Sequence, residues 1–291
     1  MWPPLISATD AMEMVTTGTE SIKFVDASWF LDKSRDPKAE HITERIRGAV
    51  HFDIDSICQQ GVSLPHMLPD PEFFARKMSD LGVSNHDSII VYESGDCFGA
   101  PRVWWTFRAF SHLKVSVLDG GLRAWKAVDG PLESGAPSPA SDITYSTPAL
   151  NTDIVASKED VIRAMRTGIA QIADARSSGR FYGTAPEPRP GLASGHVPGS
   201  LNIPFTTVLD TADASRLKPV HELQEVFAEA GVVPGARVIA TCGSGVTASV
   251  LALARHVAGE EVSRTAVYDG SWSEWGADDS LPKSTYGAAP T

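Results

Sequence analysis

The sequence repeats itself once, and this repeat constrains the fold more than any other feature of the chain. Four segments of the first half recur in the same order in the second half, and matched positions are 148 to 151 residues apart. The matched pairs are K-F-V-D-A-S with Q-I-A-D-A-R, R-G-A-V-H-F-D-I with P-G-S-L-N-I-P-F, S-I-I-V-Y-E with R-V-I-A-T-C, and V-L-D-G-G-L-R-A-W with V-Y-D-G-S-W-S-E-W. A period this long indicates one domain copied in tandem, and 291 residues are enough for two domains of ordinary size.

Each copy shows the same alternation of helical and strand-like segments. The predicted helices include residues 7–15, 71–81 and 102–110 in the first copy, and residues 157–165 and 220–230 in the second. Short apolar strands lie between these helices, and in each copy the last strand ends at Asp119 or Asp269. This alternation predicts an α/β fold in which each copy forms a parallel sheet flanked by helices on both faces. We expect one domain at 1–135, a linker rich in proline, serine and alanine at 136–152, and a second domain at 153–291.

Composition excludes several classes of function. The formal net charge of −11 argues against a nucleic-acid partner. No apolar run approaches the roughly 18–20 residues of a membrane span, so we expect no membrane partner. The N-terminus has neither a basic nor an arginine-rich leader pattern, and the three cysteines have no metal-ligand spacing. We therefore expect a cytoplasmic protein without a bound metal.

The stretch T-C-G-S-G-V-T-A places Cys242 where a buried strand, 236–240, gives way to a helix. A helix N-terminus carries unpaired N–H groups and partial positive charge, which favour a thiolate there. A buried structural cysteine is the alternative that this spacing leaves open. Ala248 excludes the arginine of a cysteine phosphatase loop, and Gly245 excludes a second redox cysteine.

The first copy differs at the matched position, where it has Glu93 followed by a longer, acidic turn. We therefore expect no thiol chemistry in that copy. Cys97 and Cys58 are interpreted as structural.

Taken together, these motifs resemble the rhodanese-type sulfurtransferases, and within that family the enzymes that use 3-mercaptopyruvate. The resemblance covers nearly the whole chain. It rests on D-A-S-W-F, F-D-I-D, H-M-L-P, A-P-R-V-W-W-T-F-R-A-F, L-D-G-G-L-R-A-W, G-R-F-Y-G-T-A-P-E-P-R, G-H-V-P-G-S-L-N-I-P-F, C-G-S-G-V-T-A and Y-D-G-S-W-S-E-W. It implies two tandem rhodanese-like domains, of which only the second is catalytic.

The resemblance also implies roles for the turn. The Cys242 thiolate would attack the donor sulfur and become a persulfide, and the backbone N–H groups around Gly243, Gly245, Val246 and Thr247 would point at that sulfur. Thiosulfate enzymes of the family resemble C-R-K-G here, with cations for a dianion. Gly243 and Ser244 are small and uncharged, as in the mercaptopyruvate enzymes.

Five further residues match family motifs. Arg180 and Arg189 match the pair that holds the carboxylate and carbonyl of the substrate, for which guanidinium forks are well suited. Ser244, His66 and Asp55 match a serine–histidine–aspartate set that could relay protons, with Asp55 orienting His66. Because His66 and Asp55 belong to the first copy, this interpretation places the site between domains.

The resemblance implies transfer of sulfane sulfur to a thiol acceptor such as thioredoxin, or to cyanide, with release of pyruvate and with no cofactor. Two alternatives stay open. One is a thiosulfate sulfurtransferase, which the uncharged turn disfavours. The other is a non-catalytic persulfide carrier, which would need Cys242 but neither the arginine pair nor the serine–histidine–aspartate set.

Overall fold

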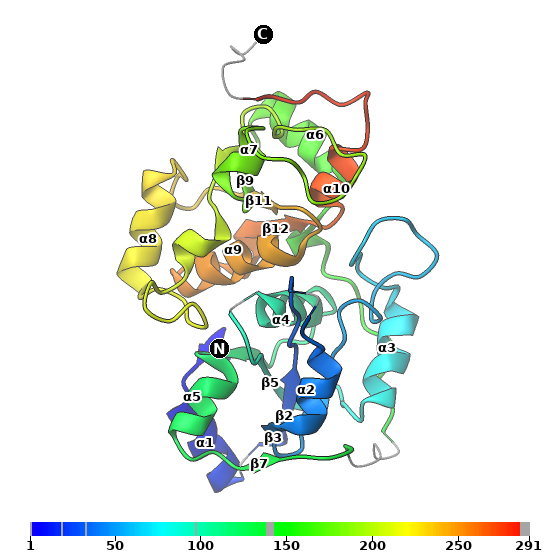
Figure 1. Ribbon diagram of the computed structural model, residues 1–291, viewed down its shortest axis with the longest axis vertical. Helices are drawn as coiled ribbons and strands as arrows, with labels where there is room; N and C mark the ends of the chain where they lie inside the picture. Colours follow the sequence, from blue (N-terminus) through cyan, green and yellow to red (C-terminus); the bar gives the residue numbers. More distant parts are fainter. Residues whose placement is uncertain (1, 19, 33, 97, 138–142, 286–291) are drawn as a thin grey trace. The chain divides into compact units, whose positions relative to one another are not determined.

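The computed structural model describes residues 2–18, 20–32, 34–96, 98–137 and 143–285, and it divides into two compact units (Figure 1). The first unit contains Met1–Gln60, Leu68–Asn151 and Asp210–Leu217, and the second contains Gly61–Met67, Thr152–Leu209 and Lys218–Thr291. Two short segments, 61–67 and 210–217, therefore belong to the unit of the other copy. Part of the linker expected at 136–152 and Cys97 lie outside the described residues.

The two units contain sheets of the same strand order, as the repeat predicts. Every strand pair in these two sheets is parallel. The first sheet has the order β1 (Leu5–Ile6), β6 (Val115–Leu118), β5 (Ser88–Tyr92), β2 (Ile22–Asp26), β4 (Val50–His51). The second has the order β8 (Val155–Ala156), β12 (Thr265–Tyr268), β11 (Val238–Thr241), β9 (Gln171–Asp174), β10 (Leu201–Asn202). In the first unit β3 (Arg45–Ile46) and β7 (Leu132–Glu133) form an additional antiparallel pair.

Helices connect these strands in both units. Those of the first unit are α1 (Ala8–Thr17), α2 (Pro37–Thr43), α3 (Pro71–Asp80), α4 (Gly99–Ala109) and α5 (Gly121–Ala127). Those of the second are α6 (Lys158–Thr167), α7 (Ser178–Phe181), α8 (Val220–Glu229), α9 (Val246–Val257) and α10 (Ser271–Trp275), with short 3₁₀ turns at Thr152–Ile154, Phe205–Val208 and Val262–Arg264. Among the described residues, no helix combines the length and the apolar character that a membrane crossing requires.

Helices cover both faces of each sheet, which confirms the predicted α/β architecture. Figure 1 shows β9, β11 and β12 between α6 and α10 on one side and α8 and α9 on the other. In the second unit one face buries Ile172, Ile239 and Tyr268 against Trp272 and Trp275 of α10. Because both faces are buried, the strands read as continuous apolar runs rather than as alternating ones.

The helix boundaries follow from local capping signals that the two copies share. Ser7 and Ser157 accept hydrogen bonds from backbone N–H groups of the first turns of α1 and α6, and Ser157 forms a full capping box with Asp160. Both helices end at a glycine in the left-handed conformation, Gly18 and Gly168. The helices expected at 7–15 and 157–165 are thus confirmed, each extending two residues further.

Glu93 follows the central strand β5 of the first unit and caps the helix that comes after it. Its buried carboxylate accepts hydrogen bonds from the N–H groups of Phe98, Gly99 and Ala100, each at 3.0 Å. Burial raises the pKa of Glu93 to about 8, although these three hydrogen bonds act in the opposite direction. An acidic side chain therefore fills the N-terminus of α4.

This burial predicts a pH dependence of stability. Since the folded-state pKa lies above that of an exposed glutamate, the contribution of Glu93 is complete at acid pH and is lost as pH rises through about 8. Glu93→Gln removes this loss. We expect the free energy of unfolding of the variant, relative to wild type, to improve by at least about 1 kcal/mol between pH 5 and pH 8. Urea unfolding at a series of pH values measures this difference, and a difference that does not change with pH would contradict the assignment.

Candidate active site

Cys242 lies in the turn between β11 and α9, as the sequence predicts. The residue is only 1% exposed. Gly245 adopts a left-handed conformation with φ of 78° and begins α9 without any side-chain cap. In the described part of the chain, the N–H groups of Ser244, Val246 and Thr247 have no hydrogen-bond acceptor. The turn thus leaves several donors at a positive helix end, where an anion is stabilised.

The N-terminus of α10 forms hydrogen bonds with the backbone of this turn. The N–H groups of Trp272 and Ser273 donate to the carbonyls of Cys242 and Gly243, at 3.0 and 2.9 Å. The Ser273 hydroxyl donates to the same Gly243 carbonyl at 2.7 Å. The fully buried Ser271 Oγ accepts from the N–H groups of Cys242 and Gly245, both at 3.1 Å, and donates to the Tyr268 carbonyl. The backbone of the turn is therefore fixed by α10 without using the donors of Ser244, Val246 and Thr247.

Both predicted arginines lie against the turn. A Cβ atom on Gly243 would be 3.1 Å from Nη2 of Arg180 and 3.7 Å from Nη1 of Arg189. Arg189 also donates through Nη2 to the Ser244 hydroxyl at 3.5 Å. The missing side chain at Gly243 allows two cations to approach the backbone beside Cys242.

A buried ionic network holds Arg180 in place. Glu187, whose side chain is 3% exposed, accepts from Nη2 and Nε of Arg180 at 2.6 and 3.2 Å and from Nη1 of Arg176 at 2.8 Å. Arg176 also pairs with Asp174 at 2.6 Å. Burial alone would lower the pKa of Arg176, but Asp174 and Glu187 more than offset this effect and raise it. Arg176 therefore stays charged and links the two carboxylates.

His66 contacts Ser244, as the sequence-based interpretation requires. Its Nδ1 lies 3.0 Å from the Ser244 hydroxyl, and the residue is buried with φ of 60°. The segment that carries it, Gly61–Met67, belongs to the second unit although it lies in the first copy of the sequence. Asp55 belongs to the first unit, where its carboxylate accepts a hydrogen bond from Nε1 of Trp29. The role of Asp55 in orienting His66 stays a prediction, as does a site between domains.

A pocket of about 690 Å³ in the second unit adjoins the turn. It includes Arg189 and Ser273, which contact Ser244 and Gly243, together with Ser63, Leu64 and Pro65 directly before His66. Glu274, Asp278 and Asp279 form its acidic part. The pocket gives a small molecule room beside Arg189 and the turn.

Comparison with known proteins identifies the family. The model of the rhodanese-like domain matches residues 7–128 and 157–278. The chain belongs to the rhodanese-like family. The chain is 40% identical over 279 residues to the 3-mercaptopyruvate sulfurtransferase of Escherichia coli K12, covering 89% of this chain and 96% of that protein. It is also 40% identical over 282 residues to thiosulfate/3-mercaptopyruvate sulfurtransferase 1, mitochondrial, of Arabidopsis thaliana, covering 90% and 73%.

A solved structure supports the same assignment. The crystal structure of SseA from Escherichia coli, which is described as having the rhodanese fold of the 3-mercaptopyruvate enzymes, aligns with a TM-score of 0.80 at 36% identity. The alignment covers 93% of this chain and 99% of that one. The two tandem rhodanese-like domains expected from the repeat are thus confirmed.

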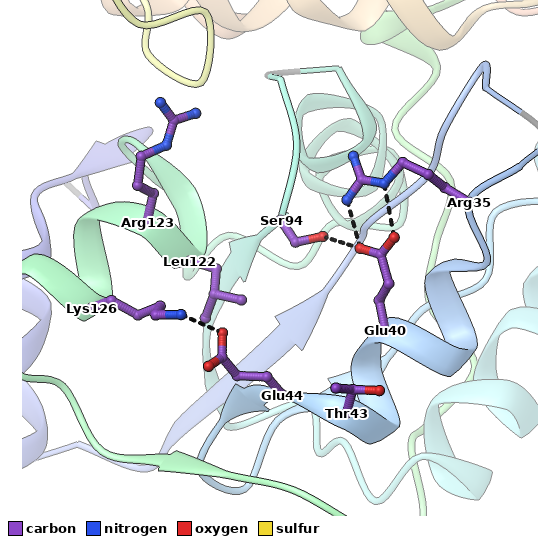
Figure 2. A pocket seen from close by; sticks show the side chains of 8 residues that line it. All are labelled: Arg35, Glu40, Thr43, Glu44, Ser94, Leu122, Arg123 and Lys126. Carbon is purple, nitrogen blue, oxygen red and sulfur yellow. Dashed lines mark hydrogen bonds and ion pairs between the residues drawn. The ribbon is translucent and has the colours of Figure 1, made fainter.

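The first rhodanese-like domain has a different pocket at the matching place. This pocket measures about 480 Å³ and is lined by residues that include Ser94, directly after Glu93, and Leu122 and Arg123 at the start of α5 (Figure 2). Figure 2 shows its two carboxylates already paired, Glu40 with Arg35 and Glu44 with Lys126. Among the described residues, the lining of this pocket is largely ionic and includes no thiol.

Sequence reasoning missed three polar residues of the site. Ser271 and Ser273 lie in Y-D-G-S-W-S-E-W, a motif that indicates the repeat and the family resemblance but assigns no role to its serines. Glu187 stands between the two predicted arginines in P-E-P-R, but nothing local indicates which cation a glutamate will contact. A serine in the second copy where the first has Gly121 was the available signal for Ser271.

A matched pair of substitutions tests how α10 supports the turn. Ser271→Ala removes the buried hydroxyl that accepts hydrogen bonds from the N–H groups of Cys242 and Gly245, so we expect it to lower the free energy of unfolding by about 2 kcal/mol. Ser273→Ala leaves the Gly243 carbonyl still bonded to the Ser273 N–H, so its cost stays below about 1 kcal/mol. Denaturant unfolding of both variants checks this order. Equal losses of free energy of unfolding would show that Ser271 stabilises the turn no more than Ser273 does.

Proposed function

We propose that this protein transfers sulfane sulfur from 3-mercaptopyruvate through a persulfide on Cys242. The observation that carries this proposal is the placement of Arg180 and Arg189 against Gly243, directly beside a cysteine at the N-terminus of α9. Two guanidinium groups suit a donor that carries a carboxylate and an adjacent carbonyl. Relatives at 40% identity that bear the names of mercaptopyruvate enzymes support the same conclusion.

The proposed reaction has two steps, sulfur uptake by Cys242 and sulfur transfer to an acceptor. The Cys242 thiolate attacks the sulfur of 3-mercaptopyruvate, an S–S bond forms, and the C–S bond of the donor breaks. The donor carbon leaves as the enolate of pyruvate and takes up a proton. The proton of the donor thiol leaves toward Ser244, whose hydroxyl lies 3.0 Å from Nδ1 of His66, and His66 relays it. An acceptor thiolate then attacks the outer sulfur and restores the Cys242 thiolate.

The N–H groups of Ser244, Val246 and Thr247 are placed to bind the anionic sulfur during both steps. Fixed donors of this kind need no reorganisation when charge develops. Gly243 and Gly245 contribute by their small size and backbone conformation. These roles rest on the turn geometry and on the family motif.

The identity of the acceptor stays a prediction, with a thiol protein such as thioredoxin, or cyanide, as the expected classes. The cytoplasmic location expected from the sequence likewise stays a prediction, since one relative is named as mitochondrial.

Thiosulfate is the second candidate donor, because the Arabidopsis relative is named for both compounds. The turn of this chain offers a dianion no cationic side chain of its own. We therefore expect thiosulfate to be the poorer donor, by at least about tenfold in kcat/KM.

Cys242→Ser tests the proposed reaction directly. Oxygen at this position cannot form a persulfide, so we expect no measurable sulfur transfer, whereas Cys58→Ser keeps the wild-type rate. Intact mass measurement after treatment with 3-mercaptopyruvate should show one added sulfur on wild type and none on Cys242→Ser. Sulfur found on another cysteine would overturn the assignment of the nucleophile.

His66→Ala tests the proton relay. The thiol of mercaptopyruvate must lose a proton and the leaving enolate must gain one, while thiosulfate requires neither transfer. We expect kcat with mercaptopyruvate to fall by about 10²–10⁴-fold and kcat with thiosulfate to change far less. Steady-state kinetics with both donors gives the comparison, and equal losses would indicate that His66 acts only in support of the turn.

A further inference from the structure

The arginines of the site belong to a buried cluster whose charges nearly cancel. The cluster consists of four ion-paired residues, Asp174, Arg176, Arg180 and Glu187, and of Arg189, which lies near Arg180 at Gly243, all in the second unit. Its three guanidinium groups and two carboxylates leave a single net positive charge. Asp174 and Arg176 have side chains that are at most 1% exposed, and Arg176 pairs with both Asp174 and Glu187. Of these five residues, Arg180 and Arg189 lie directly against the turn at Gly243, and Glu187 contacts Arg180.

Glu187 is the residue that reduces this charge. Its carboxylate is 2.6 Å from Nη2 of Arg180, and only 3% of its side chain is exposed. Arg180 is itself 24% exposed, with Nη2 lying over Gly243. Because water scarcely reaches the Glu187 carboxylate, its field on the donor site is screened much less than that of a surface glutamate.

Glu187 also limits how Arg180 can bind. The Nε and Nη2 edge of the guanidinium is the fork that matches a carboxylate, and Glu187 already occupies it. Arg180 keeps Nη1 for a donor, together with the second N–H of Nη2. Arg180 thus offers a donor fewer hydrogen bonds than a free guanidinium would.

Resting on the function proposed above, we propose that Glu187 determines donor specificity by charge: its buried negative charge beside Arg180 lowers the positive charge that the arginine pair offers, which disfavours a dianion more than a donor with one negative charge. The α-keto acid carries one carboxylate, whereas thiosulfate carries two negative charges. A dianion gains about twice as much as a monoanion from each added positive charge. Removing the Glu187 charge should therefore favour thiosulfate selectively.

The decisive variant is Glu187→Gln, which keeps the size of the side chain and an oxygen acceptor but removes the charge. We expect the ratio of kcat/KM for thiosulfate to that for mercaptopyruvate to rise by about tenfold or more. Glu187→Asp keeps the charge but shortens the reach to Arg180. It should lower kcat/KM for both donors while leaving the ratio within about threefold of wild type.

Glu225→Gln is the matched control. Glu225 lies on the exposed side of α8 and its substitution removes the same unit of charge from the chain. Both values of kcat/KM should stay at wild-type levels. A ratio in Glu187→Gln equal to that of wild type would overturn the proposal, and so would an equal rise in Glu187→Asp.

A measurement on the wild-type protein decides the matter if Glu187→Gln does not fold. Pyruvate and oxalate are carboxylates of similar size with one and two negative charges. Competitive inhibition against mercaptopyruvate should be stronger with pyruvate, and stronger inhibition by oxalate would contradict the charge match. Failure of the proposed function would be recognised separately, since wild type would then show no turnover of mercaptopyruvate at all.

Discussion

In both domains, the helix that follows the central strand begins with backbone N–H groups that have no partner within the helix. The structure depends on what binds these groups. In the first domain the Glu93 carboxylate fills that position and binds three of these groups at the start of α4. In the second domain Cys242 takes the place of the glutamate, and the donors of Ser244, Val246 and Thr247 have no acceptor in the described structure. One backbone feature thus stabilises the fold in one copy and is left open for an anion in the other.

An acidic chain needs a local arrangement to bind an anion, and Trp272 connects the two parts of that arrangement. Its backbone N–H donates to the carbonyl of Cys242, and the centroid of its ring lies 4.1 Å from the guanidinium carbon of Arg176. Arg176 in turn contacts Glu187, which holds Arg180. The cysteine turn and the arginine network therefore share one support, so that a disturbance of α10 reaches both.

Much of the fold could be predicted from the sequence because its signals are local. Strand–helix alternation located the helices to within a few residues in both copies, and the repeat predicted a parallel sheet in each. The central strand was expected at 236–240 but is Val238–Thr241. The turn after Pro234-Gly235 continues to Arg237, whose guanidinium donates to the carbonyls of Asp153 and Ser263. Such contacts between distant segments leave no periodic signal.

The same limit applies to the site. Cys242, Arg180 and Arg189 stand in recognisable motifs, and the structure places all three around Gly243. The sequence could not predict that Gly61–Met67 belongs to the second unit, because the repeat marks only where each copy begins and ends. Whether Glu187 pairs with Arg180 depends on the path of the loop that runs from Arg180 through Glu187 to β10. Predicting it would have required the backbone conformation rather than the residue types.

The contrast between Ser271 and Gly121 shows what it costs to leave the turn of the second domain open. These matched residues begin α10 and α5 with nearly the same left-handed conformation, φ of 49° and 53°. Glycine adopts this conformation freely, whereas other residues are strained by about 1–2 kcal/mol. In the first domain the N–H of Leu122 donates to the Glu93 carbonyl, as that of Trp272 does to the Cys242 carbonyl, and the Glu93 side chain accepts from the N–H groups of Phe98, Gly99 and Ala100. In the second domain the strained Ser271 supplies a hydroxyl to the N–H groups of Cys242 and Gly245. The serine thus takes over part of the structural role of the glutamate, and the donors of Ser244, Val246 and Thr247 stay available to the sulfur.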